Sequence, residues 1–225
     1  MAASFQRPKN KEELEKSGFI GLWKAQIIAK KIGEGKEKIT LESIREIHRV
    51  FFSEINPDIA GRFRKDGEDI KKLNNIEPIP GRIVFERMYE FWKEFDISIS
   101  KISPRFIGSS TKARENWNRE VLRIAAWAQY QITVIHPFCD GNGRMARIMT
   151  NVVLWRFGIQ PSNIKYEGVD KERYLNALQC IDDYQNYKYL EELIAKSVHE
   201  TYKRVYGVML KQRDLKNKRK KVHKK

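Results

Sequence analysis

Apolar residues recur along this chain at intervals of three and four positions, the spacing that places side chains on one face of an α-helix. The clearest example is the segment Leu41–Phe52, which has Thr40 as a predicted N-cap and is closed by Asn56-Pro57. The positions that share its predicted face are Leu41, Ile44, His48 and Phe51. We therefore predict a helix over 41–52.

Other segments repeat this spacing. We predict a helix over 11–32, broken at Gly18, and another helix with a face of Phe85, Met88, Tyr89 and Trp92. Two further helices are Trp117–Ile132, with Val121, Ile124, Ala125 and Ala128 on one face, and one that begins after Gly143 and stops at Gly158. The last is capped by Asp170 and carries Tyr174, Ala177, Leu178 and Ile181, and helical propensity resumes after it through Leu190, Leu193 and Ile194. Strand signals are weak. The best, Leu73–Arg82, is rich in Pro and Gly and suits an edge hairpin or an ordered loop. The pattern predicts a mostly α-helical fold.

Length and composition allow a folded core. The chain has 225 residues, 41% of them hydrophobic, with 5 Trp, 9 Tyr and 11 Phe, which excludes disorder throughout. Its two cysteines, Cys139 and Cys180, are too few for a disulfide framework and stand in no metal-ligand spacing. No signal peptide and no apolar run of about 18 residues is present, so we expect a cytoplasmic protein that does not enter a membrane.

Positive charge is concentrated at the C-terminal end. The formal charge is +15, and residues 211–225 hold nine Lys/Arg and one Asp, so the rest of the chain carries only +7. We expect this tail to be a solvated, disordered terminus, and binding of nucleic acid or another polyanion at 211–225 is the alternative.

Candidate chemistry lies in one segment, His136–Arg147, between two predicted helices. Gly141 and Gly143 flank Asn142 immediately before a helix, which allows consecutive backbone N–H groups to form an anion-binding nest. Arg144 and Arg147 lie three positions apart and therefore on one helical face, beside the same anion. The pattern favours a phosphate site.

Two more residues of the segment have suitable chemistry. Asp140 could hold a Mg²⁺ that bridges phosphate oxygens, because this ion takes one or two carboxylates together with phosphates and water. His136 has an ordinary pKa suited to removing a proton from a hydroxyl near neutral pH. The Walker A pattern is absent, so the segment is predicted to be a nucleotide-handling loop of a different kind.

The segment His136–Arg147 resembles the complete signature of the Fic family, H-P-F-x-[D/E]-G-N-G-R-x-x-R. The helix 41–52 followed by Ala60-Gly61-Arg62-Phe63-Arg64 is similar to the family's stretch ending in A-G-x-[YF]-R, and Ile76–Gly81 occupies the place of its target-docking flap. The likeness extends over about 40–195. It implies a catalytic domain at 40–200. Residues 1–39 would then form a helical extension before this domain, and residues 201–225 would contain the end of a helix followed by the basic tail.

The resemblance implies transfer of AMP from ATP to a Ser, Thr or Tyr hydroxyl of a target protein. His136 would then be the general base and Asp140 the Mg²⁺ ligand. Asn142 and the backbone from Gly141 through Gly143 to Arg144 would hold the α- and β-phosphates, and Arg147 the γ-phosphate. Relatives that phosphorylate proteins or transfer phosphocholine depart at these glycines, whereas this sequence keeps them.

Family members also inhibit themselves through a helix with the pattern [S/T]-x-x-x-E-[G/N], and Thr111–Asn116 matches it. Glu115 stands 21 residues before His136, at the far end of a predicted helix, so we expect it not to be inhibitory. Inhibition would then come from a separate, antitoxin-like protein, a neighbouring subunit, or a helix within 1–39.

Three alternatives to AMP transfer stay open. Transfer of UMP is one, because no residue identified above reads the base. A nucleotide-binding module without transfer activity is another, although the presence of His136 counts against it. The third is a nucleic-acid-binding protein that uses the basic tail, which could coexist with the enzyme.

Overall fold

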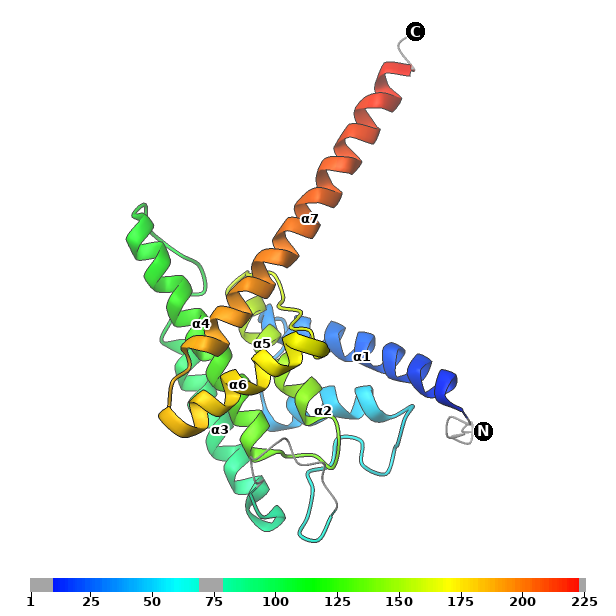
Figure 1. Cartoon of the computed structure of the whole chain (residues 1–225), viewed down its shortest axis with the longest axis vertical. Coiled ribbons are helices and arrows are strands. Elements are labelled where there is room, and N and C mark those ends of the chain that lie inside the picture. The colour runs from blue at the N-terminus through cyan, green and yellow to red at the C-terminus, as the bar shows by residue number, and fades with distance from the viewer. Residues whose placement is uncertain (1–9, 69–78, 223–225) are drawn as a thin grey trace.

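The computed structural model describes residues 10–68 and 79–222, and in these ranges every regular element is a helix (Figure 1). The helices are α1 (Lys11–Gly33), α2 (Leu41–Phe52), the 3-10 turn η1 (Gly81–Ile83), α3 (Val84–Ser100), α4 (Thr111–Ile135), α5 (Asn142–Arg156), α6 (Gly168–Tyr184) and α7 (Lys188–Val222). The prediction of a mostly α-helical fold is confirmed. None of these helices combines the length and the apolar character needed to cross a bilayer.

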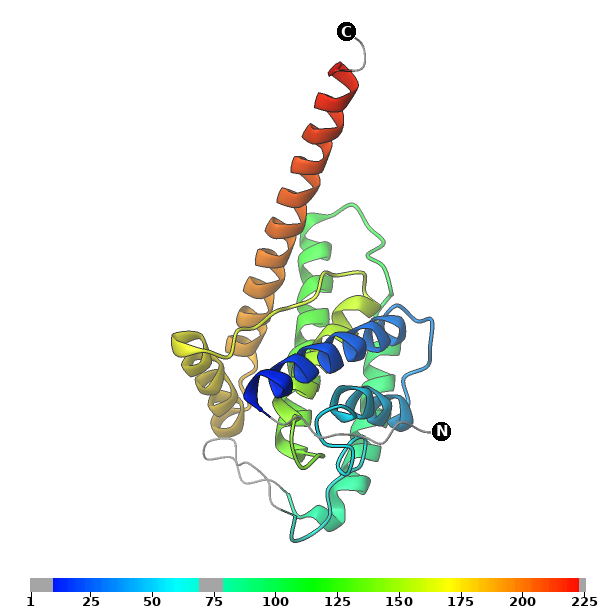
Figure 2. The same cartoon turned by 90° about the vertical axis from the view of Figure 1, so that its right-hand side faces the viewer.

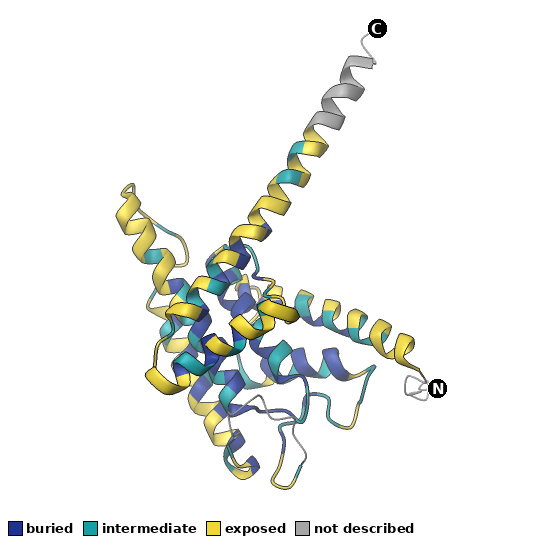
Figure 3. Ribbon diagram, in the orientation of Figure 1, coloured by how far each residue is buried: buried dark blue, intermediate teal, exposed yellow. Residues whose placement is uncertain are grey.

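Helix α5 lies at the centre of the bundle, against α1 and α4. Its buried residues include every position from Ile148 to Leu154, so they lie on all sides of the helix, as expected for a helix enclosed by others. The apolar ones include Met145, Ala146, Ile148, Met149, Val152, Val153 and Leu154. Figure 3 shows the backbone coloured by how far each residue is buried. The candidate loop directly precedes this helix. The C-terminal end of the loop is therefore anchored in the most buried part of the molecule.

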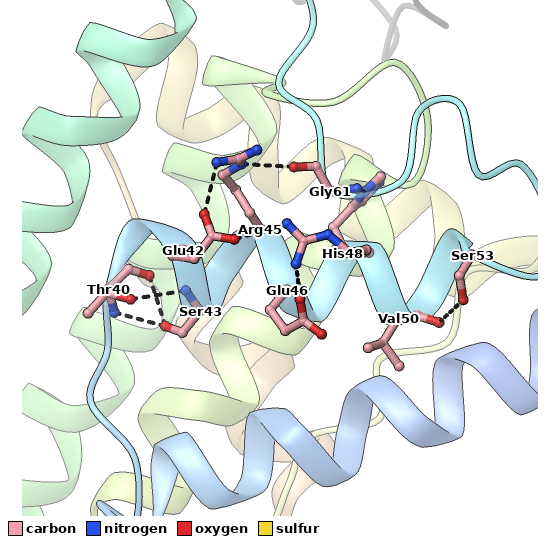
Figure 4. A network of polar contacts seen from close by, with 10 residues as sticks. Thr40, Glu42, Ser43, Arg45, Glu46, His48, Val50, Ser53 and Gly61 are labelled. Atoms are coloured by element: carbon pink, nitrogen blue, oxygen red, sulfur yellow. Dashed lines mark hydrogen bonds and ion pairs between the residues drawn. The ribbon is translucent and has the colours of Figure 1, made fainter.

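Helix α2 begins as predicted. The Thr40 hydroxyl accepts a hydrogen bond from the Ser43 N–H at 3.0 Å, and the Ser43 hydroxyl accepts one from the Thr40 N–H at 2.8 Å (Figure 4). This reciprocal capping box satisfies two N–H groups that the helix leaves free. It fixes the start of the helix that carries His48.

Helix α1 is continuous, so the predicted break at Gly18 is wrong. Glycine in a helix costs about 1 kcal/mol relative to alanine, and burial of Ala25, Ala29 and Ile32 outweighs that cost. Another glycine of this helix is needed for packing: a Cβ on Gly21 would lie 2.4 Å from the backbone oxygen of Phe51. Helix α1 therefore packs tightly on α2 and forms part of the same core.

Two other local predictions need correction. Asp170 does not cap α6, which begins at Gly168, and its carboxylate instead lies in the first turn. Helix α3 exists, but Phe85 is 64% exposed and Tyr89 is 40% exposed, because the neighbouring apolar face packs inward. The buried face consists of Val84, Met88, Phe91, Phe95 and Ile99.

Helix α7 extends away from the body of the molecule (Figures 1 and 2) and runs to Val222. The structure thus replaces the disordered tail expected at 211–225 with a helix as far as 222. Lys, Arg, Gln and Leu are good helix formers, and no Gly or Pro follows Gly207. The predicted hairpin or loop at 73–82, and the flap within it, fall mostly outside the described residues.

Candidate active site

Residues 136–141 join the end of α4 to the start of α5, and each end of this loop has a left-handed residue. His136 ends α4 with φ 50° and ψ 58°, and Gly141 precedes α5 with φ 80°. A Cβ on Gly141 would lie 2.3 Å from Cε2 of Phe52, so only glycine fits there. The left-handed conformations of these two residues let the chain turn between the end of α4 and the start of α5.

The His136 side chain is in a state suited to accept a proton. Its Nδ1 lies 3.3 Å from the Thr133 carbonyl, which can only accept, so Nδ1 carries the hydrogen and Nε2 presents its lone pair. Burial lowers the pKa of His136, the hydrogen bond to Thr133 raises it, and the nearby charge of Arg64 lowers it further. The net result favours the neutral ring.

Asn142 closes the loop on itself. Its side-chain oxygen accepts from the Phe138 N–H at 2.9 Å, and its side-chain nitrogen donates to the Phe138 carbonyl at 2.7 Å. Both polar atoms of the side chain therefore have a partner within the loop. The backbone N–H groups of Asn142 and Gly143 are the first of α5 and have no intrahelical acceptor, which makes them the donors of the nest.

Arg144 and Arg147 lie on one face of α5, as predicted, and both line a cavity of about 450 Å³ together with Leu22 and Gln26 of α1. The Arg144 guanidinium lies over the Phe51 ring, 4.5 Å from its centroid. Burial lowers the pKa of Arg144, the charge of Asp140 raises it, and that of Arg147 lowers it. Two cations on one wall of a cavity point to an anionic ligand.

The Arg147 guanidinium lies over the Tyr166 ring, 5.3 Å from its centroid. Tyr166 stands in the connection between α5 and α6, and the sequence pattern gave no sign of it. His136 and Asp140 do not line the cavity with the two arginines. They belong to the adjoining loop.

Asp140 fits a magnesium ion that is carried in by a nucleotide. Its carboxylate is 43% exposed, its Oδ1 accepts from the Gly141 N–H at 2.6 Å, and the Arg144 guanidinium is 3.7 Å away. Among the described residues no cluster of three or more His, Cys, Asp or Glu side chains could hold a metal ion by itself. A single carboxylate beside two arginines could hold Mg²⁺ if phosphate oxygens and water supplied the remaining ligands.

Two residues to which the sequence pattern gave no role hold the loop from outside. Arg64 is buried, and its Nε donates to the His136 carbonyl at 2.6 Å while Nη2 donates to the Ile135 carbonyl at 3.2 Å. His48 is fully buried and bonds to the Asp140 carbonyl. Each had a signal in the sequence: His48 is a polar residue on the predicted apolar face of its helix, and Arg64 is the last residue of the stretch 60–64 that resembles a family pattern.

The chain is similar to proteins of known family. A model of the Fic/DOC family matches residues 38–154. Two curated proteins named "Protein adenylyltransferase Fic" are similar to it: that of Culex quinquefasciatus is 32% identical over 145 residues, or 64% of this chain, and that of Nematostella vectensis is 29% identical over 168 residues, or 74% of this chain. The chain spans 25% and 35% of the length of these two relatives.

Solved structures with the same fold include Fic-1 (residues 134–508) from C. elegans, with a TM-score of 0.67 and 24% identity, covering 92% of this chain and 56% of that one. Another is a Fic-domain signalling protein from Bacteroides thetaiotaomicron, with a TM-score of 0.62 and 23% identity, covering 83% of this chain and 69% of that one. At these identities the structural likeness establishes the fold.

Proposed function

The chain belongs to the Fic/DOC family, and we propose that it transfers AMP from ATP to a Ser, Thr or Tyr hydroxyl of a target protein. The observation that carries this proposal is the placement of the His136 Nε2 lone pair on the loop that leads into the positive end of α5. The names of the curated relatives, each called a protein adenylyltransferase, support it. We assign this activity to residues 40–200, with α1 preceding them and contributing Leu22 and Gln26 to the cavity.

In the proposed reaction His136 removes the proton of the target hydroxyl. The hydroxyl oxygen then forms a bond to the α-phosphorus of ATP, and the bond from that phosphorus to the bridging oxygen breaks, releasing pyrophosphate. The proton remains on Nε2. Because burial lowers the pKa of His136, most of the enzyme holds this residue as the free base near neutral pH.

The nucleotide phosphates are held by groups at the start of α5. We assign the α- and β-phosphates to the backbone N–H groups of Asn142 and Gly143, with Gly141 and Arg144 on either side, and the γ-phosphate to Arg147. Asp140 would hold Mg²⁺, which when bound offsets charge on the phosphates. Arg147 is restrained by Tyr166, so less conformational freedom is lost when it binds an anion.

Several finer points belong to the proposal. The described residues do not identify a contact to the nucleobase, so UMP transfer is the nearest alternative. A separate inhibitory protein, and a nucleic acid or other polyanion bound at 211–225, are further proposed partners. We propose a cytoplasmic location, which agrees with Cys139 and Cys180 being unpaired thiols.

The test is incubation of the purified protein with proteins of a cell extract and isotopically labelled ATP, followed by mass spectrometry for AMP on Ser, Thr or Tyr. A parallel reaction with labelled UTP distinguishes the two nucleotides, and His136→Ala serves as the inactive control. Labelled AMP adducts that require His136 would support the proposal. Adducts of UMP alone, or no adducts with either nucleotide, would contradict it.

A further inference from the structure

His48 connects two segments that are far apart in sequence. From the middle of α2, its Nδ1 lies 2.9 Å from the Gly61 N–H and its Nε2 lies 3.0 Å from the Asp140 carbonyl, 92 residues away (Figure 4 shows His48 beside Gly61). Both ring nitrogens are thus engaged by backbone groups. One group belongs to the segment after α2, and the other belongs to the proposed catalytic loop.

The two partners determine which nitrogen carries the hydrogen. The Gly61 N–H can only donate, so Nδ1 must accept and has no hydrogen. The Asp140 carbonyl can only accept, so Nε2 must donate. Only the neutral ring protonated at Nε2 satisfies both contacts, and the side chain is fully buried with no water-facing alternative. Both contacts therefore favour a single form of the ring.

Aromatic neighbours fix the plane of the ring. His48 is stacked on Phe138, with centroids 3.7 Å apart and planes at 2°, and on its other side Phe52 lies 4.6 Å away at 16°. Phe138 is itself part of the proposed catalytic loop. A ring held between two others cannot rotate to choose other partners, so the direction of its Nε2–H is set by packing.

Several contacts together hold the loop: the Arg64 side chain on the His136 carbonyl, the Arg64 N–H on the Pro137 carbonyl, Asn142 on the Phe138 backbone, and His48 on the Asp140 carbonyl. The His48 contact is the one that lies on the residue preceding Gly141. Its position sets the direction of the Asp140 carboxylate, which accepts from the Gly141 N–H. The Nε2–H contact to the Asp140 carbonyl is part-buried, so loss of this donor would remove its protein partner at a cost comparable to a lost hydrogen bond.

We propose that His48 is a positioning residue for the loop 136–141, which through its Nε2–H donor holds Asp140 and the first N–H groups of α5 in the geometry that receives the nucleotide. His48 does not touch substrate. Its effect on nucleotide binding rests on the proposed function, whereas its effect on the loop itself does not.

Three substitutions separate the donor from the rest of the side chain. In His48→Gln the amide nitrogen can replace Nε2–H as a donor to Asp140. In His48→Asn the shorter amide can still accept from the Gly61 N–H but does not reach Asp140, and His48→Phe keeps the stacked ring without either contact. The control for a general loss of stability is Tyr130→Phe. It removes the hydrogen bond from Tyr130, on α4, to Asp182, on α6.

The first readout is amide hydrogen exchange of Gly141, measured by NMR on the protein without nucleotide. We expect exchange to become at least about tenfold faster in His48→Asn and His48→Phe, the scale of one lost hydrogen bond, and to stay near the wild-type rate in His48→Gln and Tyr130→Phe. The second is kinetic: the KM for ATP should rise about tenfold in the same two variants, with kcat within about threefold.

Wild-type exchange at Gly141 in His48→Asn would overturn the proposal, as would exchange in His48→Gln as fast as in His48→Asn. If His48→Phe fails to fold, the exchange rates of His48→Gln and His48→Asn still test whether the Nε2–H donor holds the loop. A wild-type protein that transfers no nucleotide would contradict the proposed function alone, because the exchange measurement would still report whether His48 holds the loop.

Discussion

The Nε of Arg64 donates a hydrogen bond of 2.6 Å to the backbone carbonyl of His136, 72 residues later in the chain. This carbonyl lies at the C-terminus of α4, where no intrahelical donor remains, and Arg64 also binds the Ile135 carbonyl. A cation at this end is favoured by the helix dipole. The same contacts hold His136 in its left-handed conformation at the start of the loop.

We expect His136→Ala to reduce transfer by at least about 100-fold, the usual scale for a general base. Its fold should remain, because the contacts of Arg64 are to backbone atoms that alanine retains. The measurement is the transfer rate together with the melting temperature, with His199→Ala, an exposed histidine of α7, as the control. Near wild-type transfer by His136→Ala would remove this residue from the mechanism.

Transfer should persist at moderately acidic pH. Because burial lowers the pKa of His136 below its ordinary 6.5, the ring stays neutral as the pH falls past that value and becomes protonated only at the lower pKa of the folded protein. The base form is thus present above that pKa and lost below it. A profile of kcat/KM from about pH 5 to about pH 8 should show an acid limb with a midpoint below 6.5. A midpoint at or above 6.5 would contradict the assignment.

Arg147→Ala should weaken ATP binding by about tenfold to a hundredfold, which corresponds to loss of a charge-assisted hydrogen bond. AMP binding should change much less, because the expected partner of Arg147 is the γ-phosphate. Titration calorimetry with ATP and with AMP measures both. Arg173→Ala removes an exposed arginine of α6 and is the control. Equal weakening for the two nucleotides would show that Arg147 does not bind the γ-phosphate.

Gly141→Ala should destabilise the protein more than Gly158→Ala does. Both glycines have positive φ, 80° and 68°, so each alanine costs about 1–2 kcal/mol of backbone strain. A Cβ on Gly158 meets nothing within 4 Å, whereas one on Gly141 would lie 2.3 Å from the Phe52 ring. Overpacking should add at least about 1 kcal/mol at Gly141, measured by urea unfolding. Equal losses at the two sites would argue against this close contact.

The sequence predicts the helices whose signals are local. The capping residue and apolar spacing of 41–52 identify α2 with its observed bounds, and Gly158 follows the end of α5 as expected. Where several faces of a helix are apolar, as in α3, spacing alone cannot choose the one that packs inward. That choice depends on neighbours such as α4, which are distant in sequence.

The site divides in the same way. The segment His136–Arg147 is continuous, so the residues that could act on a nucleotide are visible in the sequence. His48 and Arg64 contact backbone carbonyls of that segment. Every residue has such a carbonyl, so the sequence does not indicate which ones will be contacted. The sequence marks Arg64 as the end of a family-like stretch and His48 as a polar residue on an apolar face, but their contacts with the loop became visible only when the fold brought the three segments together.

Glu115 lies at the opposite end of α4 from the proposed catalytic loop. The helix is unbroken from Thr111 to Ile135, and Ser110 caps it by accepting a hydrogen bond from the Ala113 N–H. At 1.5 Å per residue, the 20 residues from Glu115 to Ile135 span about 30 Å. Glu115 is exposed in the first turns, where a carboxylate is favoured by the helix dipole.

Glu115→Gly should therefore leave the transfer rate within about threefold of the wild-type rate, even though Thr111–Asn116 matches the family's inhibitory pattern. An arginine–carboxylate pair requires approach within about 4 Å, which Glu115 cannot make with Arg147 of its own chain. The rate is measured at low protein concentration, where contact between subunits is minimal, and Glu120→Gly, five residues further along the same helix and also exposed, is the control. Activation of about tenfold or more, specific to Glu115, would mean that this carboxylate reaches Arg147. With no such activation, any inhibition must come from elsewhere, which is why a separate protein is retained among the proposed partners.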